Sequence, residues 1–180
     1  MKSLTERELF DSYHKDVYRT CYYMLRHAQD AEDACHDIFI TVFRQQWSSV
    51  EHIKAWLMRI TMNHCLNVLR KNKTKRDKQK LVQIQHDQSA ERTKTPDDIV
   101  IERAEAEEYA ALLHQLPDKL RAVVTLRYSS DMTTSEIAEV LHIPAGTVKS
   151  RLHKALKLLR RDMETNDWCH MRGEKTLGIH

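Results

Sequence analysis

Glycine and proline are scarce in this chain: each occurs only three times in 180 residues. These two residues supply most of the tight turns that link short strands, so their scarcity disfavours a sheet-rich fold and favours long helices. Long apolar runs are also missing, which excludes a segment long enough to span a lipid bilayer. The first residues, MKSLTERELFDSY, are charged throughout and contain no apolar core of a secretory signal, so we expect a cytoplasmic protein.

Cysteine occurs four times, without the spacing of a metal site or a disulfide framework. Cys21, Cys35, Cys65 and Cys169 are widely separated, and a cytoplasmic location would keep them reduced. Cys169 is followed by His170, but no CxxC or spaced histidine pair accompanies them. The cysteines therefore predict no metal site.

The motifs of the common enzyme classes are absent as well. The chain has no P-loop, no GxGxxG, no HExxH and no serine nucleophile elbow, and its eleven histidines are dispersed. We therefore expect no catalytic residues, no metal or other cofactor, and no small-molecule substrate. The protein is expected to act by binding other macromolecules.

Apolar residues in the first part of the chain recur at spacings of three and four, which predicts three amphipathic helices. The first covers roughly residues 4–27. The second is expected to follow Asp30 as its N-cap and to end near Trp47, and the third to run from Ile53 to Arg70. The next residues are highly polar and cannot bury a core, so a flexible linker is predicted over residues 73–95.

Helical patterns resume at residue 96 and continue to about residue 163. Pro96 suits the first turn of a helix that reaches His114, and a second helix is expected over residues 117–128. A short helix should then begin after Thr133, whose hydroxyl forms a T-x-x-E capping box with Glu136, and end near Leu141. Residues 164–180 show no pattern and receive no assigned role.

The last long helix carries a basic face. The stretch TVKSRLHKALKLLRR, residues 147–161, contains no acidic residue, although the whole chain has 29 basic and 26 acidic residues. Its apolar residues form one stripe that must pack, which leaves the basic face outward. A short helix, a tight turn and a longer basic helix are typical of helix-turn-helix units, whose second helix enters the DNA major groove.

Acidic side chains on such a helix would face DNA phosphates, whereas basic ones release counterions on binding, which explains the one-sided composition. The candidates for contacts with base edges are Ser150, His153 and Lys154. The candidates for phosphate contacts are Lys149, Arg151 and Lys157. Thr147, at the start of the helix, is assigned to the same DNA-binding face.

Two long segments together resemble one protein family. The run LPDKLRAVVTLRYSSDMTTSEIAEVLHIPAGTVKSRLHKALKLLR resembles region 4 of the extracytoplasmic-function (ECF) sigma factors of bacterial RNA polymerase, which belong to the sigma-70 family. The runs DAEDACHDIFITVFRQQW and AWLMRITMNHCLNVLRK resemble region 2 of the same factors. The resemblance implies an all-α fold with two small helical domains, region 2 over residues 1–72 and region 4 over residues 96–163, joined by the linker.

The resemblance also implies roles for residues of region 2. Asp33, His36 and Asp37 occupy the face that grips the clamp coiled coil of the polymerase β′ subunit, and the family usually has Gln where this chain has His36. The loop after the second helix, and the third helix, correspond to the part that melts and reads the −10 promoter element. The residues assigned to this DNA are Ser48, Ser49, Val50, His52, Asn63, Asn67, Arg70 and Lys71.

The basic run over residues 70–76 would then follow the phosphate backbone. Trp56 fits either a core position or a base-stacking role, and its spacing with Ile53, Leu57 and Ile60 favours the core.

In region 4 the resemblance assigns the basic helix to the −35 promoter element and the domain to the β flap of the polymerase. It further implies an anti-sigma factor, commonly membrane-bound, that holds the protein inactive. His142 stands in the turn where the family most often has Gly, and His tolerates the positive φ expected there.

On the residues alone, one other class remains open and an enzyme class is disfavoured. A free-standing helix-turn-helix regulator would bind duplex DNA without replacing the sigma subunit of the polymerase. A recombinase would need a catalytic serine or tyrosine domain larger than the first half of this chain.

Overall fold

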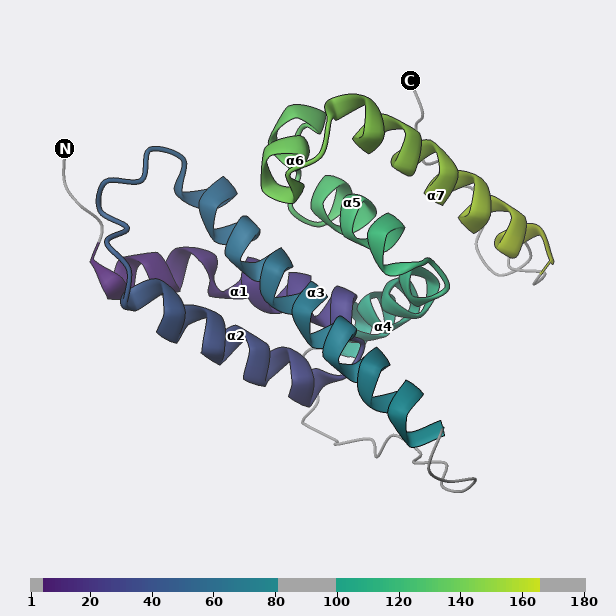
Figure 1. The fold of residues 1–180 in the computed structure, drawn as a ribbon, viewed down its shortest axis with the longest axis horizontal. Coiled ribbons are helices and arrows are strands. Elements are labelled where there is room, and N and C mark those ends of the chain that lie inside the picture. Colours follow the sequence, from purple (N-terminus) through teal and green to yellow (C-terminus); the bar gives the residue numbers. More distant parts are fainter. Residues whose placement is uncertain (1–4, 81–99, 166–180) are drawn as a thin grey trace.

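The computed structural model describes residues 5–80 and 100–165, and every element in these two ranges is a helix (Figure 1). The predicted all-α fold is confirmed. The first half contains α1 (Glu6–Leu25), α2 (Ala28–Phe43) and α3 (Ile53–Lys80). The second half contains α4 (Val100–His114), α5 (Asp118–Tyr128), α6 (Thr134–Leu141) and α7 (Ala145–Thr165). Within the described ranges, no helix has the length and apolar character needed to cross a membrane.

The start of α2 differs from the prediction. Thr5 and Glu8 form a capping box at the start of α1, and Arg26 ends that helix in the left-handed conformation with φ 73°. Because the chain reverses at Arg26, α2 begins at once, with His27 rather than Asp30 as its N-cap. Asp30 lies instead in the first turn, where its carboxylate still complements the helix dipole.

The third helix is longer than predicted. It continues past Arg70 to Lys80, so residues 73–80 of the predicted linker are helical. Lysine and arginine dominate residues 71–76, and both residue types favour helix. High polarity therefore indicated exposure correctly, but not the absence of structure. The rest of the predicted linker, and the predicted start of α4 at residue 96, lie outside the described residues.

The helix-turn-helix geometry is confirmed in the second half. Thr133 and Glu136 form the predicted capping box at the start of α6, with the Thr133 N–H donating to the Glu136 carboxylate at 2.7 Å. His142 ends α6 in the left-handed region, with φ 51° and ψ 49°. The N–H of Ile143 then donates to the carbonyl of Ala138 at 3.1 Å, and α7 begins two residues later at Ala145.

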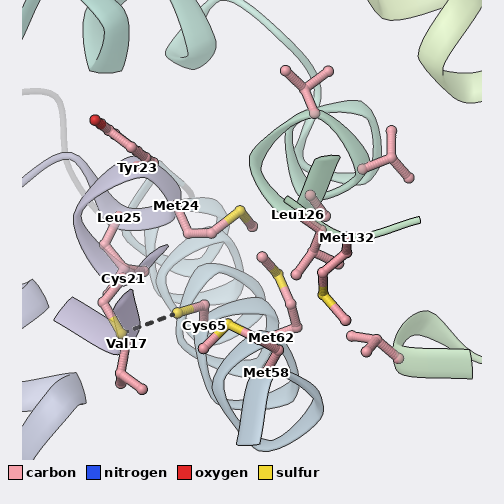
Figure 2. Close-up of a cluster of buried hydrophobic side chains, with 14 of the residues drawn as sticks. Val17, Cys21, Tyr23, Met24, Leu25, Met58, Met62, Cys65, Leu126 and Met132 are labelled. Atoms are coloured by element: carbon pink, nitrogen blue, oxygen red, sulfur yellow. Dashed lines mark hydrogen bonds between the residues drawn. The ribbon is translucent and has the colours of Figure 1, made fainter. Parts of the chain in front are cut away.

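The two halves pack against each other through α1 and α3, which contact α4, α5 and α6, whereas α2 packs on α1 and α3 (Figure 1). Methionine side chains from both halves fill this shared core, and Figure 2 shows Met58 and Met62 of α3 facing Leu126 and Met132. All four are at most 2% exposed. Flexible thioether side chains suit the irregular gap between two helical layers. The fold is thus two helical units with one continuous core.

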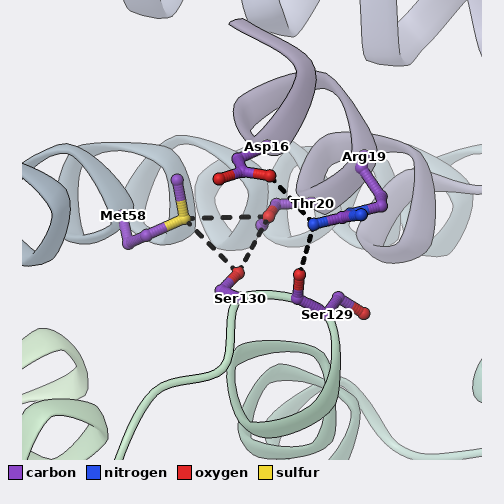
Figure 3. Close-up of polar contacts among 6 residues, drawn as sticks. All are labelled: Asp16, Arg19, Thr20, Met58, Ser129 and Ser130. Carbon is purple, nitrogen blue, oxygen red and sulfur yellow. Dashed lines mark hydrogen bonds and ion pairs between the residues drawn. The ribbon is translucent and has the colours of Figure 1, made fainter. Parts of the chain in front are cut away.

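Polar contacts border this core. The hydroxyls of Thr20 and Ser130 lie 3.5 Å apart, and each donates to the Met58 sulfur, at 3.7 and 3.6 Å (Figure 3). Beside them the Arg19 guanidinium donates to the Ser129 carbonyl at 2.6 Å and pairs with Asp16 at 2.9 Å (Figure 3). The rings of Tyr23 and Tyr109 also meet edge to face across the halves, with centroids 4.9 Å apart.

Candidate polymerase and DNA interfaces

The predicted polymerase-binding residues lie together on the outer face of α2. Asp33, His36 and Asp37 are all exposed, while the opposite face of the helix buries residues such as Ala34 and Ile38. The spacing of three and four places the three side chains on one stripe. Two exposed carboxylates on one stripe suit a basic partner surface.

One residue of this face was not predicted. Ile40 is 38% exposed, one of the large apolar side chains left open to solvent in the described part of the chain, and it follows Asp33 by seven positions and Asp37 by three. The same helical spacing that grouped the acids could have identified it. An exposed isoleucine beside carboxylates adds apolar contact area to an otherwise acidic surface.

The loop between α2 and α3 is anchored at both ends. Trp47 is buried, its carbonyl accepts from the N–H of Val50 at 3.0 Å, and the carbonyl of His52 accepts from the N–H of Trp56 at 3.0 Å. Ser48, Ser49 and His52 are exposed, and Val50 is half-buried against the core. The predicted −10 loop is therefore a short exposed turn held by buried neighbours.

A cavity of about 240 Å³ lies beside this loop. Its walls come from the loop, from the first turns of α3 and from α6, and its lining residues are Val50, Glu51, His52, Ala55, Trp56, Arg59, Glu139 and Val140. Trp56 packs partly against the core, as its spacing favoured, and its remaining surface lines the cavity.

Further along α3, the predicted amide and basic side chains are exposed on one face. Asn63, Asn67 and Arg70 follow one another at spacings of four and three, and the Arg70 guanidinium donates to the Asn67 side-chain oxygen at 3.0 Å. Lys71 is exposed next to them. Arg59, which the sequence reasoning missed, is exposed one turn before Asn63 and extends the same face into the cavity.

The basic face of α7 is arranged as predicted. Val148 and Ala155 are fully buried on its inner side. The exposed residues of the predicted DNA-binding set are Lys149, Ser150, His153, Lys154 and Lys157. Thr147 and Arg151 are half-buried at the edges of this face, and the Ser150 hydroxyl donates to the Thr147 carbonyl at 3.0 Å.

The structure does not unite the two predicted DNA-binding sets in one site. The −10 set lies on α3 and its preceding loop, while α7 packs on α5 and α6. Helix α6 contacts both α3 and α7 and so stands between the two sets. Hydrogen bonds from the Thr133 backbone and hydroxyl, followed by the positive charges of Lys54 and His52, hold the pKa of the Glu136 carboxyl on α6 below its ordinary value.

The thiols of Cys21 and Cys65 are buried side by side in the core. Cys21 and Cys65 are buried, with their sulfurs 3.7 Å apart (Figure 2), and neither is in a disulfide. The hydrogen bond between them, together with burial, raises the pKa of the Cys21 thiol, which keeps it protonated and unreactive. Among the described residues, no three His, Cys, Asp or Glu side chains are grouped as metal ligands.

Each half of the chain matches a known family model. Residues 9–75 match the model of Sigma-70 region 2, and residues 106–159 match that of Sigma-70, region 4. The chain is 29% identical over 163 residues to the ECF RNA polymerase sigma factor SigW of Bacillus subtilis (strain 168), covering 87% of each chain. It is 29% identical over 160 residues to SigX of the same organism, covering 87% of this chain and 82% of SigX.

Two solved structures share the fold. The sigma factor RpoE in complex with the anti-sigma factor NepR from Bartonella quintana gives a TM-score of 0.68 at 18% identity, over 89% of this chain and 97% of RpoE. CnrH in complex with the cytosolic domain of CnrY gives 0.63 at 17% identity, over 90% of this chain and 91% of CnrH. With both regions matched in order along one short chain, this protein belongs to the sigma-70 family, as one of its ECF sigma factors.

Proposed function

We propose that this protein binds core RNA polymerase, directs it to promoters with a −35 and a −10 element, and helps to open the DNA at the −10 element. The observation that carries the proposal is the presence of both family regions in order, each with an exposed set of residues suited to its task. Residues 1–72 are assigned to polymerase binding and the −10 element, and residues 96–163 to the −35 element and the β flap.

The α2 face supports the polymerase contact in this proposal. Asp33 and Asp37 offer carboxylates to a basic coiled coil of the β′ clamp, and His36 replaces the family's usual Gln between them. Because rim charges mainly steer association, their removal would slow assembly with the core enzyme. Since core polymerase works in the bacterial cytoplasm, the proposal places the protein there.

The DNA contacts of the proposal divide between α3 and α7. Asn63 and Asn67 present amide groups that can hold an unpaired base, with Arg70 and Lys71 beside them for the strand's phosphates. The basic face of α7 suits the major groove of duplex DNA, with Lys154 and His153 toward the base edges. One promoter would therefore be read as duplex at one site and as an opened strand at the other.

Control by an anti-sigma factor is also part of the proposal. It is supported by the solved structure of the sigma factor RpoE, which has the same fold and was captured with the anti-sigma factor NepR. Deleting the gene of such a partner should raise transcription from the target promoters. Unchanged transcription after that deletion would argue against this form of control.

Run-off transcription with purified core polymerase tests the proposal. The chain is added to a pool of promoter templates from its host, and specific transcripts are expected only when it is present. Asn63→Ala should then impair opening at the −10 element and Lys154→Ala recognition of the −35 element. If core polymerase gave no transcript with this chain, but the housekeeping holoenzyme were stimulated or repressed, the protein would instead be a free-standing regulator.

A further inference from the structure

The connection between α2 and α3 contains one buried side chain. It covers residues 44–52, and within it Trp47 is only 8% exposed. Val50 is half-buried against the core, and the other seven residues of the connection are exposed. A loop whose backbone lies at the surface keeps a fixed position only through the side chains that reach the core. In this loop those side chains are Trp47 and Val50.

A series of backbone hydrogen bonds ties Trp47 to the end of α2. The N–H of Gln45 donates to the carbonyl of Val42 at 3.0 Å, and the N–H of Trp47 donates to the carbonyl of Gln45 at 3.1 Å. The N–H of Val50 then donates to the carbonyl of Trp47 at 3.0 Å. Since Val42 is a fully buried residue of α2, the position of Trp47 is set from a packed helix.

The last of these hydrogen bonds closes a tight turn with Ser48 and Ser49 at its corner. Both serines are exposed, while the residues on either side of them, Trp47 and Val50, reach the core. The turn therefore presents two hydroxyl side chains to solvent and is fixed at each end. Such preorganisation lowers the ordering cost of binding and keeps the contacts in one geometry.

The same connection leads directly into the helix that carries the other predicted −10 residues. Helix α3 begins at Ile53, and Asn63 lies on its exposed face. The N–H of Trp56 donates to the carbonyl of His52 at 3.0 Å, which joins the end of the loop to the first turn of α3. The loop is thus fixed to α2 through Trp47 and to α3 through His52. A displaced turn would leave α3 in place and misalign only the contacts of the loop.

We propose that Trp47 is a positioning residue for recognition of the −10 element: its buried side chain holds the turn so that Ser48 and Ser49 meet the DNA, while Trp47 itself does not touch the DNA. Val50, which the resemblance assigned to the DNA, is the second anchor of the same turn. The inference rests on the proposed function, because it assumes that this loop contacts the −10 strand. It adds a buried residue that determines how strictly the −10 bases are read.

Run-off transcription from one promoter and from derivatives with a single changed base tests this inference. With the wild type, a changed base in either the −10 or the −35 element should lower the transcript about tenfold. Trp47→Ala removes the anchor. We expect this variant to discriminate at least one −10 position only about twofold and to retain the full −35 discrimination. Trp47→Phe keeps an aromatic anchor and should restore the tenfold ratio.

The ratio of transcripts separates positioning from folding. Trp47→Ala also removes a large buried side chain, so it should lower stability as well. Leu25→Ala is the matched control, because Leu25 is 7% exposed and lies at the end of α1, which leads into the start of α2, whereas the loop follows the end of α2 (Figure 2). A smaller folded fraction affects every template equally. The control should therefore lower all transcripts and leave all ratios unchanged.

Full −10 discrimination by folded Trp47→Ala would overturn the inference. An equal loss of discrimination at both promoter elements would also overturn it, and so would the same loss in Leu25→Ala. If circular dichroism showed that Trp47→Ala does not fold, Val50→Gly takes its place, because Val50 is only half-buried. Unchanged −10 discrimination by Val50→Gly would then overturn the inference. A wild type that gives no transcript with core polymerase would contradict the proposed function instead, which is a separate result.

Discussion

The guanidinium of Arg121, in α5, donates a hydrogen bond of 2.7 Å to the carbonyl of Met24, at the end of α1 and 97 residues earlier in the chain. The same side chain donates to the carbonyls of Leu113 and Leu116, at 3.2 and 3.1 Å, and pairs with Asp118. Arg121 is only 5% exposed. One buried cation therefore satisfies carbonyls at the ends of two helices and joins the two halves.

Arg121→Ala should destabilise the protein strongly. The variant would leave three buried carbonyls without the hydrogen-bond donor that the guanidinium supplies. We expect this to cost about 3 kcal/mol of unfolding free energy. Urea unfolding followed by circular dichroism measures the change. Arg7→Ala is the matched control, because its side chain is 92% exposed and its ion pair with Asp11 is long at 3.9 Å. Equal losses in both variants would contradict the role of Arg121.

His114 should make stability depend on pH. Burial, followed by the nearby charges of Arg121, Arg26 and His27, lowers its pKa from the ordinary 6.5 to about 4. The unfolded chain therefore binds a proton more readily than the folded chain between these values. Stability is fully present above pH 6.5 and is lost as the pH falls towards 4.

The matched comparison is His114→Gln, which cannot titrate. Between pH 7.5 and pH 5 the wild type should lose about 1 kcal/mol more unfolding free energy than the variant, after allowance for the partial exposure of the ring. Thermal or urea unfolding at the two pH values gives the difference. Parallel losses in wild type and variant would show that other groups carry the pH dependence.

His142→Gly should stabilise the helix-turn-helix unit. His142 holds φ 51° and ψ 49°, a conformation that costs a side chain about 1 kcal/mol and costs glycine little. We expect a gain of about 0.5–1 kcal/mol in unfolding free energy. His142→Ala keeps the Cβ atom and should give no gain. A gain in the alanine variant would mean that the imidazole, and not the backbone, is unfavourable.

Lys154→Ala should weaken recognition of the upstream promoter element. Loss of a lysine at a base edge costs about 1–2 kcal/mol, or roughly a fivefold to thirtyfold loss of transcription at limiting factor. Run-off transcription from an intact promoter and from one with a changed −35 element distinguishes a specific from a general effect. Lys119 is exposed in the first turn of α5, so Lys119→Ala is the control and should retain activity.

Much of the local structure was predictable from the residues. The Thr133–Glu136 capping box and the outward basic face of α7 follow from short-range patterns, and the structure has both. The left-handed turn at His142 was expected from the resemblance to ECF sigma factors, and the structure has it as well. The exposed stripe of Asp33, His36 and Asp37 follows from the same helical period. These features depend on side chains within one or two turns of each other, and so the sequence carries them directly.

Predictions from charge and polarity were wrong where the structural effect of a residue depends on its surroundings. Polar, basic residues after Arg70 predicted a linker, but such residues also form stable exposed helix, and α3 continues to Lys80. Asp30 is a good N-cap by type, but the reversal at Arg26 places the start of α2 three residues before it, with His27 as the cap. Arg59 was missed because a single basic residue in a helix gives no signal without the cavity beside it.

The sequence by itself determined most of the helices and their inner and outer faces, because these follow from periodicity and local capping. The order of the two regions followed from the resemblance of two long segments to one family. Only the tertiary structure decided that the halves share one core, that Arg121 reaches Met24, and that α6 forms one wall of the cavity beside the loop between α2 and α3. Those contacts join residues such as Thr20 and Ser130, 110 positions apart. They depend on how two finished surfaces fit together, which no local pattern specifies.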